Sequence, residues 1–122
     1  MKFSKISEAE MEVMQIIWAS DEPLASSDII EQMPSKRDIK ITTLLTFLSR
    51  LTEKGLLSHE KRGKKNYYFA IVTEREYKKF ESKSFLSTIH GGSIKSFMVA
   101  LCDDDEISRE ELEELKKWLS QK

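Results

Sequence analysis

Hydroxyl side chains are concentrated in the segment 39–55, where Thr42, Thr43 and Thr46 stand between Lys40 and Arg50. Short hydroxyl side chains are unusual on a purely solvated helix surface, because Thr is a poor helix former and Lys or Glu would serve better. They suit a surface held close to a polar partner, such as a nucleic-acid groove. Considered alone, the segment is explained equally well as an ordinary core helix that happens to be rich in threonine.

The element that must position these hydroxyls is a helix. Leu44, Phe47, Leu48 and Leu51 recur at steps of three and four residues, so they form one apolar stripe. The threonines fall largely outside this stripe. Gly55 follows the last periodic residues and is expected to cap the C-terminus. The pattern therefore predicts a helix with one face in the core and a hydroxyl-rich face outside it.

Charge is distributed unevenly along a chain whose net charge is only −1. The segment 36–65 holds nine Lys and Arg residues against three acidic ones, a net charge of +6. The acidic residues gather elsewhere, in 103–106 and 110–114. A concentrated basic patch on a nearly neutral chain is typical of a nucleic-acid-binding regulator.

Two helices are expected to precede the threonine-rich helix. Ser7 and Glu10 form a capping box at the start of the first. The second is short and runs from Ser26 or Ser27, as the N-cap, to Gln32. A short helix, a brief connection and a threonine-rich helix follow the order of a helix-turn-helix.

After Gly55 the periodicity changes to that of strands. The tripeptide Gly63-Lys64-Lys65 is a turn sequence, and the aromatic and β-branched segment 66–72 is typical of a strand. A hairpin joined to a helix-turn-helix makes a winged helix. Four basic residues at the wing tip are expected to reach phosphate: Lys61, Arg62, Lys64 and Lys65. The alternative is that lysines merely protect a solvated hairpin edge.

The last fifty residues predict three short amphipathic helices. Thr73 with Glu76 and Ser108 with Glu111 form two further capping boxes, and Gly91-Gly92 ends the first of these helices. Their apolar faces are expected to meet across a two-fold axis, unless they fold back on the winged helix. The residues assigned to this dimerisation surface are Phe85, Ile89, Ile94, Phe97, Met98, Leu101, Leu112, Leu115, Trp118 and Leu119.

The composition excludes several classes of protein. The chain has 122 residues, of which 39% are hydrophobic and 34% charged, so it is expected to be mostly helical or to complete its core with a partner. It has no run of about 18 apolar residues and no apolar signal region, so we expect a cytoplasmic protein without membrane insertion. With one cysteine, Cys102, two distant histidines and no glycine-rich phosphate loop, we expect no enzyme, metal site or cofactor.

The fold class predicted is therefore mostly α with a small β-hairpin wing, an α+β arrangement. Residues 1–72 are expected to form a winged-helix DNA-binding domain, and residues 73–122 a helical dimerisation domain.

The sequence resembles the BlaI/MecI family of penicillinase and methicillin-resistance repressors. The resemblance covers nearly the whole chain in collinear order. In the first half it depends on SEAEMEVM at 7–14 with Ile17-Trp18, and on TLLT at 43–46 with Arg50-Leu51 and Lys54-Gly55. Farther along it depends on Tyr67-Tyr68-Phe69, on Gly91-Gly92 and on SREELEEL at 108–115. It implies a repressor that binds a palindromic operator in double-stranded DNA as a homodimer.

The resemblance also implies roles for single residues. Thr43 and Thr46 match recognition-helix positions that face bases, where a Thr methyl and hydroxyl can contact a thymine methyl and a base acceptor. Lys40, Thr42 and Arg50 match positions near the DNA backbone.

Two residues of this helix depart from the family pattern. The family often has Arg where Leu45 stands and Pro where Ile41 stands. Because Arg to guanine is the commonest specific contact, the loss of that Arg changes the operator sequence that is expected.

Regulation in the penicillinase repressors resembles a proteolytic switch, in which a membrane-bound β-lactam sensor acts directly or indirectly and the repressor is cut between Asn and Phe. The corresponding bond here joins Ala100 and Leu101, another departure. No Cys-rich tail of the copper-responsive cousins is present. The alternatives are a winged-helix repressor with a different inducer and no proteolytic switch, and a protein-binding winged-helix module.

Overall fold

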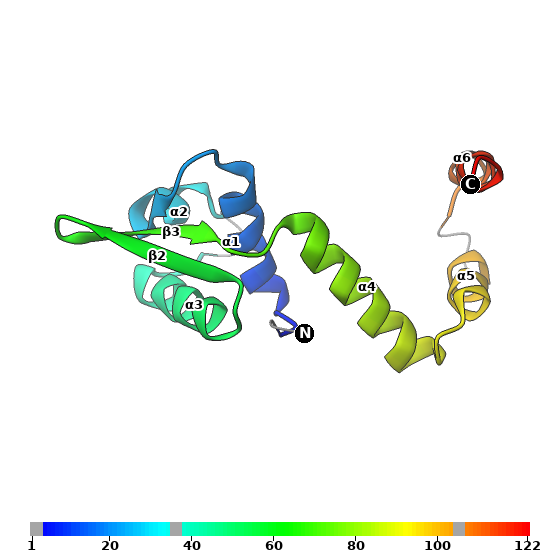
Figure 1. Cartoon of the computed structure of the whole chain (residues 1–122), viewed down its shortest axis with the longest axis horizontal. Helices are drawn as coiled ribbons and strands as arrows, with labels where there is room; N and C mark the ends of the chain where they lie inside the picture. Colours follow the sequence, from blue (N-terminus) through cyan, green and yellow to red (C-terminus); the bar gives the residue numbers. More distant parts are fainter. Residues whose placement is uncertain (1–3, 35–37, 104–106) are drawn as a thin grey trace. The chain divides into compact units, whose positions relative to one another are not determined.

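The computed structural model describes residues 4–34, 38–103 and 107–122. Within them the chain forms six helices and three strands (Figure 1). Two compact units divide between Lys79 and Phe80, inside one continuous helix. The elements are α1 (Glu8–Ala19), β1 (Leu24–Ala25), α2 (Ser26–Gln32), α3 (Ile41–Glu53), β2 (Leu57–Arg62), β3 (Lys65–Ala70), α4 (Glu74–His90), α5 (Ile94–Asp103) and α6 (Arg109–Ser120).

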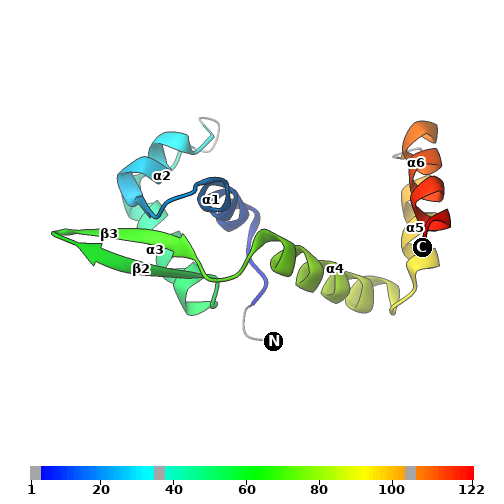
Figure 2. The ribbon, with the colours of Figure 1, turned by 45° about the horizontal axis from the view of Figure 1, so that its top comes forward.

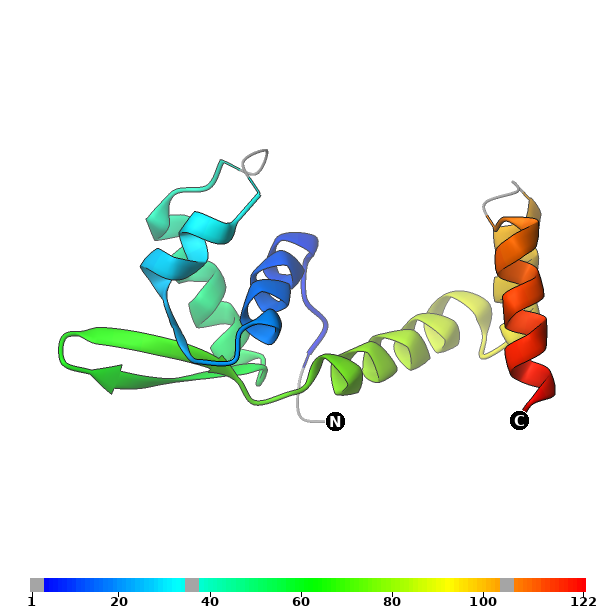
Figure 3. The same cartoon turned by 90° about the horizontal axis from the view of Figure 1, so that it is seen from above.

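The first unit is a winged helix, and the predicted fold class is confirmed. Its antiparallel sheet has the order β1-β3-β2, with α1, α2 and α3 on one side (Figure 3). The β2–β3 hairpin projects beyond the helices as the predicted wing (Figure 2). Strand β1 was not predicted. It is only two residues long and pairs Leu24 with Tyr68 and Ala25 with Tyr67, which leaves too few residues for a periodic pattern.

The core of this unit is drawn from every helix of the winged fold. Its fully buried side chains include Val13 and Met14 of α1, Ile29 of α2, and Leu44, Leu48 and Leu51 of α3. Burying one such side chain contributes about 1.5–3 kcal/mol. The predicted apolar stripe is therefore the inner face of α3.

The first turns of α4 belong to this core as well. Tyr77 is 1% exposed, and its hydroxyl accepts a hydrogen bond of 2.9 Å from the backbone N–H of Ile6. The Trp18 indole donates to the carbonyl of Val72 at 2.8 Å. These bonds tie both ends of the winged helix together.

The predicted N-terminal caps agree with the structure at three helices and differ at one. Ser7 and Glu10 form the capping box of α1, Thr73 and Glu76 that of α4, and the Ser108 hydroxyl caps α6 by accepting from the N–H of Glu111. The N-cap predicted at Ser26 or Ser27 is wrong, because Ala25 is the N-cap of α2. Pairing with Tyr67 holds the backbone of Ala25 extended. The Asp28 carboxylate accepts a hydrogen bond of 3.2 Å from the N–H of Ala25.

Helix α3 ends as predicted. Gly55 has φ +87°, the left-handed region that glycine enters without strain. The N–H of Gly55 donates a hydrogen bond to the carbonyl of Thr52, and the N–H of Leu56 donates one to the carbonyl of Leu51. These two hydrogen bonds are the pattern of a Schellman motif. The helix therefore stops at a defined residue, and strand β2 begins directly after it.

Of the described helices, none is by itself both long and apolar enough to cross a membrane. Only α4 and α5 taken together reach that length and composition, and they do so as a bent pair.

A partly buried ion pair joins the start of α1 to the end of α3. Glu10 is 1% exposed, and its Oε1 accepts from the Lys54 ammonium at 2.7 Å and from the Ser7 N–H at 2.8 Å. Burial raises the pKa of Glu10, but the hydrogen bonds from Lys54 and Ser7 outweigh it and hold that pKa below its ordinary value. The carboxylate is therefore charged at neutral pH.

Replacing Lys54 with Met should lower the free energy of unfolding by about 2 kcal/mol at pH 7, because it leaves the buried carboxylate without its cation. Because the pKa of Glu10 is lower in the folded protein than in the unfolded chain, its charged form stabilises the fold at pH values above the unfolded-state pKa. This stabilisation is lost as the pH falls through the folded-state pKa. The difference between variant and parent should therefore shrink on acidification. Urea unfolding at successively lower pH, followed by Trp18 fluorescence in a Trp118→Phe background, measures it.

The matched control is Lys78→Met, which removes an exposed i,i+4 pair with Glu74. It should cost less than about 0.5 kcal/mol. Equal losses in the two variants would contradict the assigned role of Lys54.

Candidate nucleic-acid interface

The outer face of α3 carries the hydroxyls that the sequence singled out. At 100° per residue, Thr46 stands opposite the buried Leu48–Leu51 side of the helix. Thr42, Thr43, Thr46 and Arg50 are all exposed, as is Lys40 at the N-cap. The leucines thus fix the rotation of α3, and this rotation places the threonines toward solvent.

The hydroxyl of Thr46 already has one partner. It donates to the carbonyl of Thr42 at 3.1 Å, one turn earlier. Its lone pairs remain available, so in this rotamer the hydroxyl can accept from an adenine or cytosine amino group while the methyl contacts thymine. The sequence suggested a donor role instead, which requires the hydroxyl to rotate away from the helix.

Of the two residues that depart from the family pattern, Leu45 stands beside this face, next to Thr42, whereas Ile41 lies in line with Leu48 in the first turn of the helix. Ile41 and Leu45 are each 43% exposed. Neither can donate a hydrogen bond to guanine, but both can contact a thymine methyl. Leu45 extends the threonine face with an apolar margin.

The basic residues of the wing are distributed by strand alternation. Lys61 lies opposite Asn66, while Arg62 and Lys65 form the last pair before the loop and face the other side of the sheet. Lys64 occupies the two-residue loop with Gly63, whose φ of +64° suits a tight hairpin turn. All four basic residues are exposed, but they do not share one face.

Arg62 is engaged within the wing. Its guanidinium forms an ion pair with Glu60 and lies over the ring of Tyr67, 5.0 Å from the centroid. These contacts hold it on the face shared with Lys65, away from Lys61. Of the four basic residues predicted at the wing, Arg62 is therefore the least available to phosphate.

A shallow pocket of about 260 Å³ lies between the wing and the start of α2. It brings side chains that sequence reasoning missed next to the wing lysines. The lining residues are Ala25, Ser26, Ser27, Leu45, Lys64, Lys65, Asn66 and Tyr68. Two adjacent serines, Ser26 and Ser27, were the available clue, but in the sequence their position predicts only an N-cap.

The basic segment divides into different roles. Lys36 and Arg37 lie outside the described residues. Lys54 is bound to Glu10, as shown above. What remains for a polyanionic partner is Lys40 and Arg50 on α3 with Lys61, Lys64 and Lys65 on the wing.

The residues assigned to dimerisation lie in the second unit, whose helices are open to solvent. No side chain of α5 or α6 is buried. Ile89, Ile94, Trp118 and Leu119 are more than half exposed. Six of the ten predicted residues line one apolar groove of about 370 Å³: Phe85, Ile94, Phe97, Met98, Leu115 and Leu119.

The family model named penicillinase repressor matches residues 6–121. The chain belongs to this family. It is 33% identical to the methicillin resistance regulatory protein MecI of Mammaliicoccus sciuri, over 99% of this chain and 98% of that protein. It is 32% identical to the penicillinase repressor of Bacillus licheniformis, over 98% of this chain and 93% of the relative. The family consists of DNA-binding repressors and not of enzymes.

A solved structure agrees with the winged helix of this family member. The solution structure of monomeric Bacillus licheniformis BlaI in complex with the blaP half-operator is similar with a TM-score of 0.52 and 33% identity. The similarity covers 62% of this chain and 92% of that one.

Replacing both Lys64 and Lys65 with Ala should weaken binding about equally on every DNA sequence, because phosphate contacts carry no base information. The slope of log affinity against log salt should become shallower by about 2. Fluorescence anisotropy on specific and random duplexes at several salt concentrations measures both quantities. Lys78→Ala with Lys79→Ala is the matched control, since it removes the same charge from α4.

Replacing Thr46 with Glu should abolish specific binding and leave the fold intact, since the side chain is exposed and the acid would face bases and phosphates. The expected loss is about hundredfold, or roughly 3 kcal/mol. Thr52→Glu makes the same change on another side of α3 and should bind DNA nearly as the parent does. Equal DNA affinities of the Thr46→Glu and Thr52→Glu variants would refute the assignment of the threonine face of α3 to base contacts.

Proposed function

We propose that this chain is a transcriptional repressor that binds a palindromic operator as a homodimer, controls β-lactamase or other antibiotic-resistance genes, and is released by proteolysis in its second unit. The observation that supports DNA binding best is the exposed threonine face of α3, held opposite a fully buried leucine stripe and accompanied by a lysine-tipped wing. The half-operator complex of the BlaI relative supports the same placement.

The mechanism follows from this geometry. The outer face of α3 enters the major groove, where Thr43 and Thr46 contact base edges. Lys40, Thr42 and Arg50 fix the helix on the backbone, and Lys61, Lys64 and Lys65 neutralise phosphates beside the groove. Contact with about six phosphates gives a log–log salt slope near −5. RNA polymerase is excluded while the operator is covered.

Homodimerisation is proposed for the second unit. Helices that bury none of their side chains are rarely stable alone, because packing of an apolar face supplies most of a helix's stability. A second copy covers the exposed groove and the adjacent Ile89 and Trp118. Two α3 helices then reach successive major grooves about 34 Å apart, or a multiple of that distance.

The proposed switch acts through this interface. Ala100 and Leu101 lie in the last turns of α5, with Ala100 exposed and Leu101 half-buried. A protease needs extended chain, so cleavage there requires α5 to unwind, and a helix without buried side chains opens at low cost. Cutting the bond removes α6 with Leu112, Leu115, Trp118 and Leu119, which lowers dimer stability and hence operator affinity. A membrane-bound β-lactam sensor would trigger the cut directly or indirectly in the cytoplasm.

One observation favours a second candidate, a repressor of the same kind without a proteolytic switch. The bond that matches the family's cleavage site joins Ala to Leu and not Asn to Phe. A different inducer would then release the operator. Incubating the repressor with membranes from cells exposed to a β-lactam, followed by mass measurement, separates the two: a fragment ending at Ala100 supports the switch.

Truncation after Ala100 should lower dimerisation and operator affinity together, because it removes five residues of the proposed interface: Leu101, Leu112, Leu115, Trp118 and Leu119. Sedimentation velocity and anisotropy on a two-half-site duplex measure the two effects. Unchanged sedimentation would refute the interface. The full-length variant Leu115→Glu with Leu119→Glu should act in the same way, while Lys116→Glu with Lys117→Glu, at exposed positions of the same helix, should remain dimeric.

A further inference from the structure

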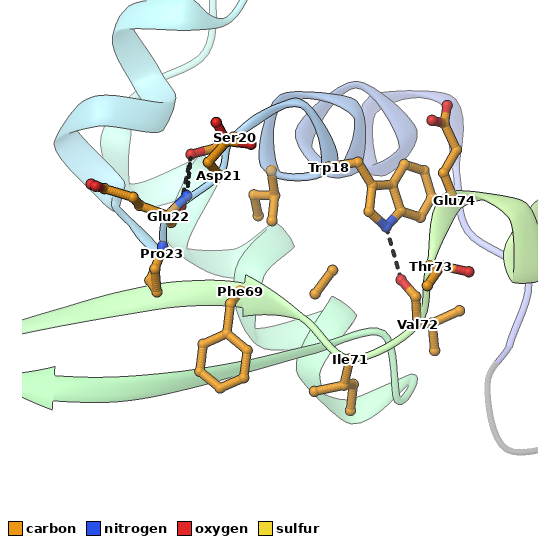
Figure 4. Close-up of a pocket in the computed structure, with 12 residues that line it drawn as sticks. Trp18, Ser20, Asp21, Glu22, Pro23, Phe69, Ile71, Val72, Thr73 and Glu74 are labelled. Carbon is orange, nitrogen blue, oxygen red and sulfur yellow. Dashed lines mark hydrogen bonds between the residues drawn. The ribbon is translucent and has the colours of Figure 1, made fainter.

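A pocket of about 420 Å³ lies in the first unit, at the end of β3 away from the wing tip (Figure 4). It shares no residue with the proposed DNA-binding set. Its apolar walls come from Trp18, Pro23, Phe69, Ile71 and neighbouring core residues, and its acidic rim from Asp21, Glu22 and Glu74. We call it the edge slot.

The edge slot lies along an unpaired stretch of strand. Strand β1 covers β3 only at Tyr67 and Tyr68, and the chain does not pair with β3 before Leu24. Farther along the chain, the carbonyl of Val72 accepts a hydrogen bond from the Trp18 indole N–H. Three residues of the β3 edge, 69–71, therefore lie between these two occupied positions.

The direction of the backbone groups along this edge follows from the ladder. The N–H of Ile71 bonds to the carbonyl of Leu56, toward β2. Because successive residues of an antiparallel strand point to opposite sides, the N–H and C=O of Ala70 face the edge slot. Among the described residues, no backbone hydrogen bond to Ala70 from the α1–β1 loop is found.

The loop itself cannot fill the gap. The backbone groups of Glu22 are already hydrogen-bonded to the Ser20 side chain (Figure 4). The Ser20 hydroxyl donates to the Glu22 carbonyl at 2.7 Å and accepts from the Glu22 N–H at 3.2 Å. Phe69 and Ile71 project from one side of the strand, and Ile71 is 55% exposed. The slot thus offers one donor, one acceptor and an apolar wall together.

We propose that the edge slot binds a short extended segment of a partner protein by strand addition, with an apolar side chain against Ile71 and Phe69 and a Lys or Arg next to it. Strand addition is favoured because backbone groups on the wall would pair with a peptide. The basic residue is favoured by charge complementarity, since Asp21 and Glu22 are exposed carboxylates on the rim. The site would take about three residues of the segment, at about 3.4 Å each.

The test uses the full chain with Trp118→Phe, so that Trp18 is its one tryptophan and reports on the slot. The probe is the blocked pentapeptide Lys-Val-Ile-Val-Lys, titrated while Trp18 emission is followed. Saturable binding is expected. Methylating the central amide nitrogen of the peptide should weaken binding about tenfold, the value of one hydrogen bond, and replacing both lysines with Glu should weaken it by at least as much.

Variants of the protein give a second readout. Asp21→Asn with Glu22→Gln should bind the peptide about tenfold more weakly, while Glu110→Gln with Glu114→Gln, which removes two exposed acids from α6, should bind as the parent does. The proposal is overturned by an unresponsive Trp18, by equal affinity for the methylated or the Glu-flanked peptide, or by tighter binding of benzyltrimethylammonium, which would make the slot a small-cation pocket.

Discussion

The rotation of α3 about its own axis depends on three leucine side chains. Leu44, Leu48 and Leu51 are at most 1% exposed, and they pack on the side of the helix that faces α1 and the sheet. A turn of one residue position, about 100°, would expose a leucine and bury a threonine, at a cost of several kcal/mol. The core therefore determines which side chains a DNA groove can meet. The Glu10–Lys54 pair and the Schellman motif at Gly55 set where that helix ends.

The wing depends on a second constraint, the register of β2 against β3. A two-residue loop fixes that register, and alternation then sends Lys61 to one face and Arg62 with Lys65 to the other. Charge counting treats these residues as equivalent, but their surroundings differ. Glu60 and Tyr67 hold Arg62 on the outer face, so the useful positive charge of the wing lies at its tip and along Lys61.

Much of the fold could be predicted because its patterns are local. Helix α3 follows from the spacing of its leucines, and the hairpin from Gly63 between two strand-like segments. Strand β1 could not be predicted, because Leu24 and Ala25 form a strand only by pairing with residues more than forty positions away. The bond between Glu10 and Lys54 is missed for the same reason. Exposure of the threonines likewise follows from the leucine stripe, whereas the engagement of Arg62 depends on Tyr67, a neighbour on the other strand. The dimer interface and the cleavage bond remain predictions, since both concern partners.

The threonine content of α3 has a consequence for its dynamics. Ile41, Thr42, Thr43, Thr46 and Thr52 are β-branched, so five of thirteen residues disfavour an isolated helix. The segment is helical because the surrounding protein holds it, and it has little tendency to remain so after the core opens. Its backbone amides should then exchange with solvent only through global unfolding, at the same free energy as the most protected amides of α1. A repressor built in this way loses its ability to recognise DNA at the temperature at which the domain melts, with no partly folded state that still reads sequence.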